Sequence, residues 1–134
     1  METTVERRTI NPWAWQQKFG YQQGVEANGV QRTLWISGQT SLDADGKVVS
    51  AGDMAGQINQ VIDNIEAVLT GADMTPANLV ALKFLTTDMA GFSQNAMALT
   101  RLNQAGSQHT STAVQVSQLA YPELLIEIEA TAVA

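Results

Sequence analysis

Two carboxylates, Glu127 and Glu129, interrupt the mostly apolar C-terminal run LLIEIEATAVA (residues 124–134). Successive side chains of a strand point to opposite faces, so the two glutamates share one face, with Cα atoms about 6.5–7 Å apart. A carboxylate on a partly dry face can act as a general base, and Glu127 is the candidate for that role. The ordinary interpretation, the solvated face of a sheet, is kept for Glu129.

Two other groups of residues could take part in binding or chemistry. His109, the only histidine, precedes Ser111 by two residues, which leaves open a His–Ser dyad or a loop histidine in solvent. The segment NPWAWQQKFGY (11–21) gathers the aromatic residues Trp13, Trp15 and Phe19. They could form the wall of a ligand pocket or an arm packed on a neighbouring subunit.

Composition limits the class of protein. The 134 residues predict one domain, 1–134, with a real core, and the absence of cysteine excludes a disulfide framework and a thiol nucleophile. With one histidine and scattered carboxylates, we expect no metal and no cofactor. The polar start METTVERRTINPW and the lack of an apolar run of about 20 residues predict a cytoplasmic protein without membrane contact.

The charge also argues against nucleic acid as a partner. The formal net charge is −6, from seven basic and thirteen acidic residues. Arg7 and Arg8 are adjacent, but the other basic residues are scattered along the chain. Phosphate recognition depends on clustered cations, so we expect no nucleic-acid binding.

Hydrophobic periodicity and turn signals predict an alternating order of elements. Strands are expected at 21–27, 31–37, 79–87, 111–118 and 124–133, with a further N-terminal strand at 4–10, and helices at 54–70 and 92–104. Asn28-Gly29 predicts a hairpin turn between the first two of these strands, and Asp45-Gly46 a second turn. Asp53 is expected to cap the long helix, which Gly71 would end, and Thr75-Pro76 opens a short turn.

Both helices should cover the same face of one sheet, because each connects strands by a right-handed crossover. The opposite face stays uncovered. Its expected members are Trp35 or Ile36, Leu82 or Phe84, and Val114 or Val116, beside Glu127. A partly apolar open face favours assembly with other copies of the chain.

Four stretches together resemble the Rid family, the reactive intermediate/imine deaminase group also called YjgF-like. They are GYQQGVEANG (20–29), LWISGQTSLDADGKVV (34–49), DMAGF (88–92) and IEIEATAV (126–133). The resemblance implies an α+β fold of the chorismate-mutase-like type, with a single sheet and two helices on one face. It also implies a homotrimer with small-molecule clefts between subunits, and hydrolysis of imines or enamines to a carbonyl compound and ammonia.

The resemblance also assigns residues to the cleft. Glu127 matches the glutamate that holds and activates water. The expected substrate-binding positions are Tyr21, Ser37, Gly38, Phe92, Ser111 and Ala113. Ser111 departs from the deaminase branch, which carries an arginine there. An arginine fork binds a carboxylate bidentately, whereas a serine hydroxyl offers one neutral hydrogen bond.

Two functions remain open from the sequence. The first is a hydrolase for a small reactive imine or enamine, with Glu127 as general base and no arginine clamp. The second is a non-catalytic trimer that binds a small metabolite or a partner protein in the cleft between subunits. Ribonuclease activity, which the family has also been linked to, ranks third because the chain is acidic and lacks a basic patch.

Overall fold

The computed structural model describes residues 5–134 and confirms the predicted order of elements. Residue 4, the first of the expected N-terminal strand, lies outside the described part. The strands are β1 (Glu6–Ile10), β2 (Gly24–Asn28), β3 (Thr33–Gln39), β4 (Leu79–Thr86), β5 (Thr110–Gln115) and β6 (Ile126–Val133). The helices are α1 (Met54–Gly71), α2 (Met89–Gln94) and α3 (Thr100–Gln104). Short 3₁₀ helices span Trp15–Phe19, Pro76–Asn78 and Ala96–Leu99.

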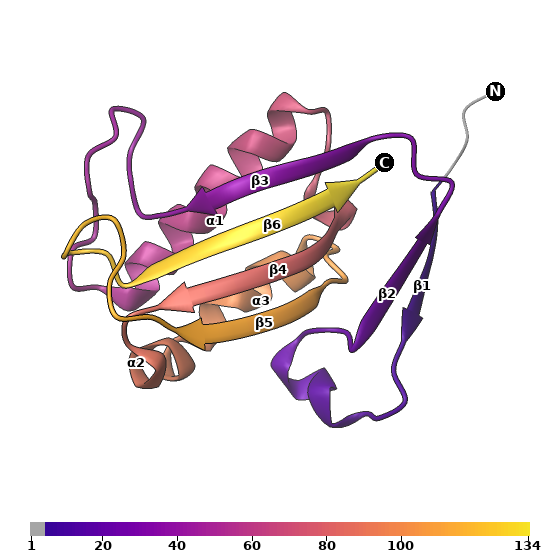
Figure 1. The fold of residues 1–134 in the computed structure, drawn as a ribbon, viewed down its shortest axis with the longest axis horizontal. Coiled ribbons are helices and arrows are strands. Elements are labelled where there is room, and N and C mark those ends of the chain that lie inside the picture. The colour runs from indigo at the N-terminus through magenta and orange to yellow at the C-terminus, as the bar shows by residue number, and fades with distance from the viewer. Residues whose placement is uncertain (1–4) are drawn as a thin grey trace.

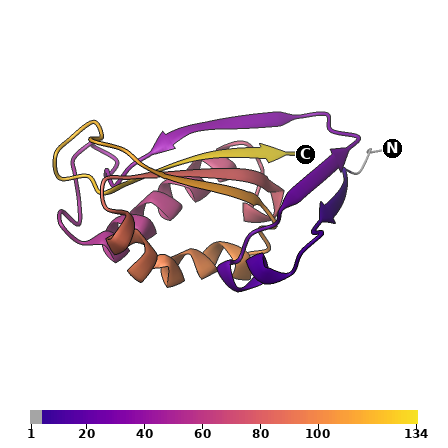
Figure 2. The same ribbon diagram turned by 60° about the horizontal axis from the view of Figure 1, so that its bottom comes forward.

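A four-stranded mixed sheet in the order β3-β6-β4-β5 forms the centre of the molecule (Figure 1). β6 runs antiparallel to both neighbours, and β4 runs parallel to β5. All three α-helices lie beneath the same face (Figure 2), as expected from the crossovers. The core between the layers is built from aliphatic residues of α1 together with Ile36, Leu82, Phe84, Ile126 and Ile128.

The long helix α1 begins as predicted but ends differently. The side chain of Asp53 accepts a hydrogen bond from the Gly56 amide and so caps the helix. Gly71 is still helical, and the left-handed residue that reverses the chain is Asp73, with φ 56°. The predicted glycine cap is therefore wrong, and an aspartate, one of the residue types that tolerate this conformation, takes its place.

The predicted helix 92–104 is broken into α2, a 3₁₀ turn and α3. Asn95 ends α2 with φ −113°, and its side-chain amide donates to the carbonyl of Gly91 at 2.7 Å. A side chain that competes for backbone groups in this way disfavours a continuous helix. The apolar spacing predicts the helical conformation of this segment correctly, but it does not predict the break at Asn95.

β1 and β2 form a separate antiparallel hairpin, so the predicted β2–β3 hairpin is wrong. Gly29 does turn the chain, with φ 74°. The amides of Gln31 and Arg32 then donate to the carbonyl of Ala134, and β3 pairs with β6. Pairing with a long central strand therefore displaces the local hairpin. We call residues 6–28, which stand apart from the main sheet in Figure 1, the arm.

Arg7 ties the arm to the end of the sheet. Its guanidinium donates to the carbonyls of Ala77, of Leu79 at 2.5 Å and of Gln108 at 3.1 Å. These carbonyls precede or begin β4 and β5, so one side chain joins three segments. Burial lowers the pKa of Arg7, but a guanidinium remains charged at any physiological pH.

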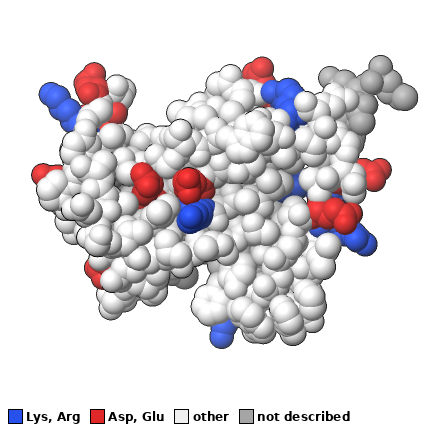
Figure 3. All heavy atoms as spheres, viewed as in Figure 1, with Lys and Arg blue, Asp and Glu red and all other residues white. Residues whose placement is uncertain are grey.

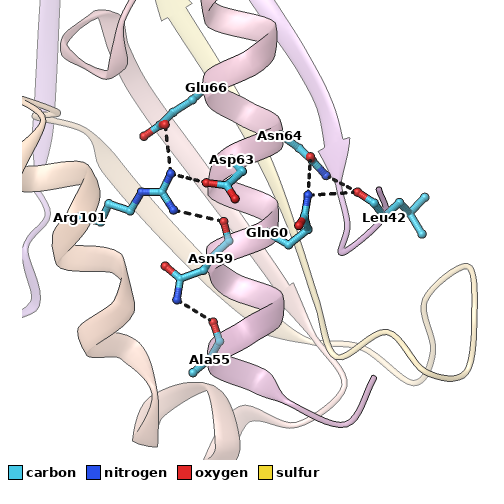
Figure 4. Close-up of polar contacts among 8 residues, drawn as sticks. All are labelled: Leu42, Ala55, Asn59, Gln60, Asp63, Asn64, Glu66 and Arg101. Carbon is cyan, nitrogen blue, oxygen red and sulfur yellow. Dashed lines mark hydrogen bonds and ion pairs between the residues drawn. The ribbon is translucent and has the colours of Figure 1, made fainter. Parts of the chain in front are cut away.

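Polar side chains fasten the helices to each other and to the loop after β3 (Figure 4). Arg101 in α3 pairs with Asp63 and, at 3.1 Å, with Glu66 of α1. Asn64 and Gln60 donate to the carbonyl of Leu42. The loop that follows the Ser37-Gly38 pair is therefore held against α1 from below.

The open face of the sheet is partly apolar, as expected. Trp35 is 77% exposed on this face. The cross-strand register places Lys83, Glu129 and Thr112 together on the same side. The expected placement of Leu82 or Phe84 on the open face is wrong, because both are buried on the helix side together with Ile36.

Arg7→Met should lower the free energy of unfolding by about 2–3 kcal/mol, because charged hydrogen bonds to three backbone carbonyls are lost. Urea unfolding followed by circular dichroism measures this change. Arg8→Met is the matched control, because the pair that Arg8 forms with Glu26 at 3.2 Å is exposed and its loss should change the stability little. Equal losses in the two variants would contradict the role of Arg7.

Candidate functional site

Glu127 and the Ser37-Gly38 pair lie side by side on the open face. β3 and β6 pair from Thr33 to Ile36, and a register shift follows before Gln39 meets Ile128. At this irregularity the missing side chain of Gly38 makes room for Glu127. A Cβ built on Gly38 would lie 2.6 Å from Cδ of Glu127 and 2.8 Å from its Cγ. Glycine is therefore required at position 38 to leave Glu127 in place.

The charges on the open face form one small group. Figure 3 shows this face almost free of charge except for acidic and basic side chains near its middle. The register places Lys83 opposite Glu129 and Leu85 opposite Glu127. A hollow of about 560 Å³ adjoins this group, lined by Trp35, Ser37, Lys83, Glu129 and threonines of β5 and β6.

The surroundings of Glu127 suit a general base. Partial burial raises the pKa of Glu127, and the nearby carboxylate of Glu129 raises it further. Loss of hydration disfavours the charged form, and so does a like charge. A carboxylate with a raised pKa binds a proton more strongly and is a better base once it is ionised.

Ser111 and Ala113 lie on the other side of the sheet. Ser111 is opposite Leu82 and Ala113 is opposite Phe84 in the parallel pair β4–β5. Leu82 and Phe84 are buried towards the helices, so the two β5 residues point to that side as well. Ser111 is half-buried and Ala113 is exposed, because β5 is the edge strand of the sheet.

Tyr21 lies at the same edge of the sheet as Ser111. The amide of Gln22 donates to the carbonyl of His109 at 2.8 Å, and Gln22 forms a parallel bridge with Thr110. Next to it, Trp15 meets the Tyr21 ring edge-on at a centroid distance of 6.4 Å. The arm therefore brings aromatic rings to the start of β5.

Phe92 lies in the core beneath the sheet. Its ring packs against Phe84 at a centroid distance of 5.4 Å, and it is only 7% exposed. Phe84 belongs to β4, so Phe92 supports the sheet from the helix side, on the face opposite Glu127. Within one copy of the chain, Phe92 therefore lies apart from Glu127.

The predicted His109–Ser111 dyad is wrong, and so is the solvent-exposed alternative for His109. His109 is 5% exposed and its Nδ1 is hydrogen-bonded to the hydroxyl of Ser107 at 2.6 Å. Burial lowers the pKa of His109 to about 4, with a smaller contribution from the charge of Arg7. Ser107 is itself buried. The Ser107–His109 pair is therefore part of the buried region that the arm contacts.

The residues predicted for one site thus form two groups on opposite sides of one sheet. The first, which we call the open-face half-site, consists of Ser37, Gly38 and Glu127. The second, which we call the arm half-site, consists of Tyr21, Ser111 and Ala113. Sequence reasoning missed Lys83, although a lone lysine within the apolar run LVALKFL (79–85) is a signal for a strand with one partly polar face.

Within residues 5–134, no group of three or more histidine and acidic side chains is arranged to hold a metal ion. None of the helices described is both long and apolar enough to cross a membrane.

Fold and site together define a small α+β domain with a partly buried glutamate, Glu127, on the open face of a mixed sheet. The family model Endoribonuclease L-PSP matches residues 14–134. A RutC family protein of Pyrococcus horikoshii is 31% identical over 113 residues, 84% of this chain and 85% of the relative. The chain therefore belongs to the Rid/YjgF family, which the sequence motifs had indicated.

Solved structures of the family share the fold. YyfB of Yersinia pestis, described as a Rid family protein of unknown function, is 35% identical with a TM-score of 0.87, and the match covers 96% of this chain and 98% of that one. The YjgF gene product of E. coli is 27% identical with a TM-score of 0.68, and the match covers 84% of this chain and 87% of that one.

Glu127→Gln should stabilise the protein at pH 7. The pKa of Glu127 is raised above its usual 4.5 in the folded chain, so the unfolded state loses this proton at a lower pH. The free energy of unfolding therefore falls as the pH rises from the usual pKa through the raised pKa, and it stays lower at any pH above the raised pKa. Glutamine removes this penalty.

Thermal unfolding of both proteins from pH 3.5 to 7.5 tests this. The melting temperature of the variant should exceed that of the wild type at neutral pH, and the gap should close below the usual pKa. Glu129→Gln removes only the smaller contribution to the raised pKa of Glu127, so it should give a smaller rise in melting temperature at neutral pH. A Glu127→Gln protein that is less stable than wild type at pH 7, with the gap closing in acid, would contradict the expected sign.

Proposed function

We propose that the protein hydrolyses a small reactive imine to a carbonyl compound and ammonia. The observation that carries the proposal is the position of Glu127, half-buried on the open face, with a raised pKa and its side chain held over Gly38. The resemblance of the sequence motifs to the Rid family implies the same class of reaction, whereas the name of the matching family model, Endoribonuclease L-PSP, points to RNA cleavage.

The proposed hydrolysis proceeds by addition of water and loss of ammonia. Water adds to the carbon of the C=N bond while the Glu127 carboxylate accepts a proton from that water. Glu127 then gives the proton to the nitrogen, and the resulting carbinolamine loses ammonia as its hydroxyl oxygen becomes the carbonyl. The net reaction consumes one imine and one water, and releases one carbonyl compound and one ammonia. An enamine enters the same sequence after it tautomerises to the imine.

The site is completed by a second copy of the chain, and we propose a homotrimer with three such sites. The two half-sites face away from each other within one sheet, so they cannot enclose one small molecule. In a closed ring, a heterologous contact brings the open-face half-site of one copy against the arm half-site of the next. Substrate would then lie between Glu127 of one subunit and Tyr21 and Ser111 of its neighbour.

The second candidate is a non-catalytic trimer that binds a metabolite or a partner protein in the same cleft. The neutral Ser111 favours this alternative, because the arm half-site offers no guanidinium fork for a carboxylate. A ribonuclease is less well supported. Among the described residues, Lys83 is the one cation that lines the open-face hollow, and Glu129 lies opposite it. A phosphate backbone needs clustered cations.

Glu127→Gln should reduce imine hydrolysis by about 10²-fold or more, the usual scale of general acid–base catalysis. Ammonia release is followed while an oxidase forms the imine in situ. Glu129→Gln, one pleat further along β6, should stay within a few-fold of the wild type. A Glu127→Gln protein with full activity would assign the chain to the binding class, and equal losses in both variants would contradict the separate role of Glu127.

Mixing two inactive variants tests whether the site lies between copies. Light scattering should first give a particle of three times the 14.4 kDa chain mass. Glu127→Gln and Tyr21→Ala proteins, each impaired alone, are then mixed under conditions that allow subunits to exchange. About a quarter of the clefts should combine two intact half-sites, with activity recovered in proportion. A monomer, or no recovery after proven exchange, would overturn the shared site.

A further inference from the structure

The arm carries a cluster of large aromatic side chains that the protein does not bury. Trp13, Trp15 and Phe19 are 58%, 55% and 64% exposed. Single exposed apolar residues are common on proteins, but a contiguous exposed group marks a site of contact with a ligand or partner. The group continues into Tyr21 of the arm half-site, because Trp15 packs edge-on against the Tyr21 ring.

The base of this cluster is fixed. Gln16, between the two tryptophans and Phe19, is completely buried and so turns the neighbouring rings outward. Asn103 of α3 donates to the carbonyl of Gly20 at 2.7 Å, and a Cβ on Gly20 would lie 2.7 Å from the Asn103 side-chain oxygen. A rigid aromatic surface loses little conformational freedom on binding, which favours specific recognition.

The segment that carries the cluster has little charge of its own. Lys18 is the only charged residue between positions 11 and 23. Its ammonium lies 5.2 Å from the centre of the Phe19 ring, where a cation–π contact holds it. On the adjoining β5 edge, Ser111 and Ala113 are small and neutral. The arm half-site therefore offers rings and hydroxyl groups, with no fork for a carboxylate.

We propose that the arm half-site recognises an aromatic, uncharged substituent of the imine. This inference rests on the proposed function and names its substrate class: an aldimine or ketimine that bears an aromatic ring and no α-carboxylate. The ring lies against Trp15, Phe19 and Tyr21, and the C=N carbon is directed towards Glu127 of the adjacent copy. The small side chains at 111 and 113 leave room for the ring.

Four imines separate ring recognition from charge recognition. A flavin amine oxidase forms neutral imines from benzylamine and from ethylamine, and an amino-acid oxidase forms the carboxylate-bearing imines of phenylalanine and alanine. The wild type should hydrolyse the benzylamine imine with a kcat/KM at least about tenfold above that of the ethylamine imine, a ratio that a well-formed apolar pocket can achieve. Both α-imino acids should be slower than their neutral counterparts.

The double variant Trp15→Ala/Phe19→Ala should lower kcat/KM for the benzylamine imine at least about tenfold more than for the ethylamine imine, and so remove that preference. Tyr121→Ala is the matched control, because Tyr121 is a 47% exposed aromatic residue outside the arm. Lys18→Met should leave the rates of α-imino acid hydrolysis unchanged, because Lys18 binds no carboxylate in this proposal. Equal rates for the two neutral imines, or an arm variant that slows both alike, would overturn the inference while the hydrolase stands.

Binding of benzamide, a stable analogue of the aromatic imine, distinguishes failure of the inference from failure of the proposed function. In a Trp13→Phe/Trp35→Phe protein, the remaining Trp15 should change its fluorescence with benzamide but not with acetamide. Binding of benzamide without hydrolysis of any imine would retain the recognition and overturn the enzyme. Absence of both would overturn both.

Discussion

The alternation of side chains across β5, β4 and β6 is the constraint on which the site depends. Leu82 of β4 lies opposite both Ser111 and Ala130, and Lys83 lies opposite both Thr112 and Glu129. Because register fixes the face of every residue, Glu127 and Ser111 are separated by the thickness of the sheet. No rotamer change can unite them in one chain. A cleft that uses both residues must therefore be an interface.

The arm is the part of the described structure in which buried polar groups are least completely hydrogen-bonded. The buried side-chain atoms that lack a hydrogen-bond partner in residues 5–134 belong to Arg7, Gln16 and Gln23, all of which lie in the arm. Such atoms cost free energy unless another group satisfies them, whereas the main sheet and α1 leave none of this kind within the described residues. The arm thus combines unsatisfied polar groups with exposed aromatic rings, as expected of a segment that contributes to a shared site.

Local signals predicted the elements that depend on local interactions. Asp53 and the apolar spacing of α1 were sufficient to predict that helix. Asp45-Gly46 was sufficient to predict a turn in the loop between β3 and α1. The β2–β3 hairpin failed because Asn28-Gly29 supplies a turn but does not choose the partner of β3, which pairs with the distant β6. The interpretation of His109 failed partly for the same reason, since the backbone of His109 pairs with the distant Gln22 of the arm and its ring is buried.

In the proposed assembly, catalysis and substrate recognition would depend on different strands of the fold. Glu127 requires only β6 and the glycine of β3, where Gly38 allows the close approach of its side chain. The substituent of the substrate meets β5 and the arm, which reach the cleft from the neighbouring copy in the proposed assembly. An arginine at position 111 would select a carboxylate through charge, whereas aromatic rings select through apolar area and shape. Because the two half-sites share no residue, replacing one kind of recognition with the other leaves the base and its pKa unaltered. The loss of the arginine is therefore compatible with a retained hydrolytic step on a different class of imine.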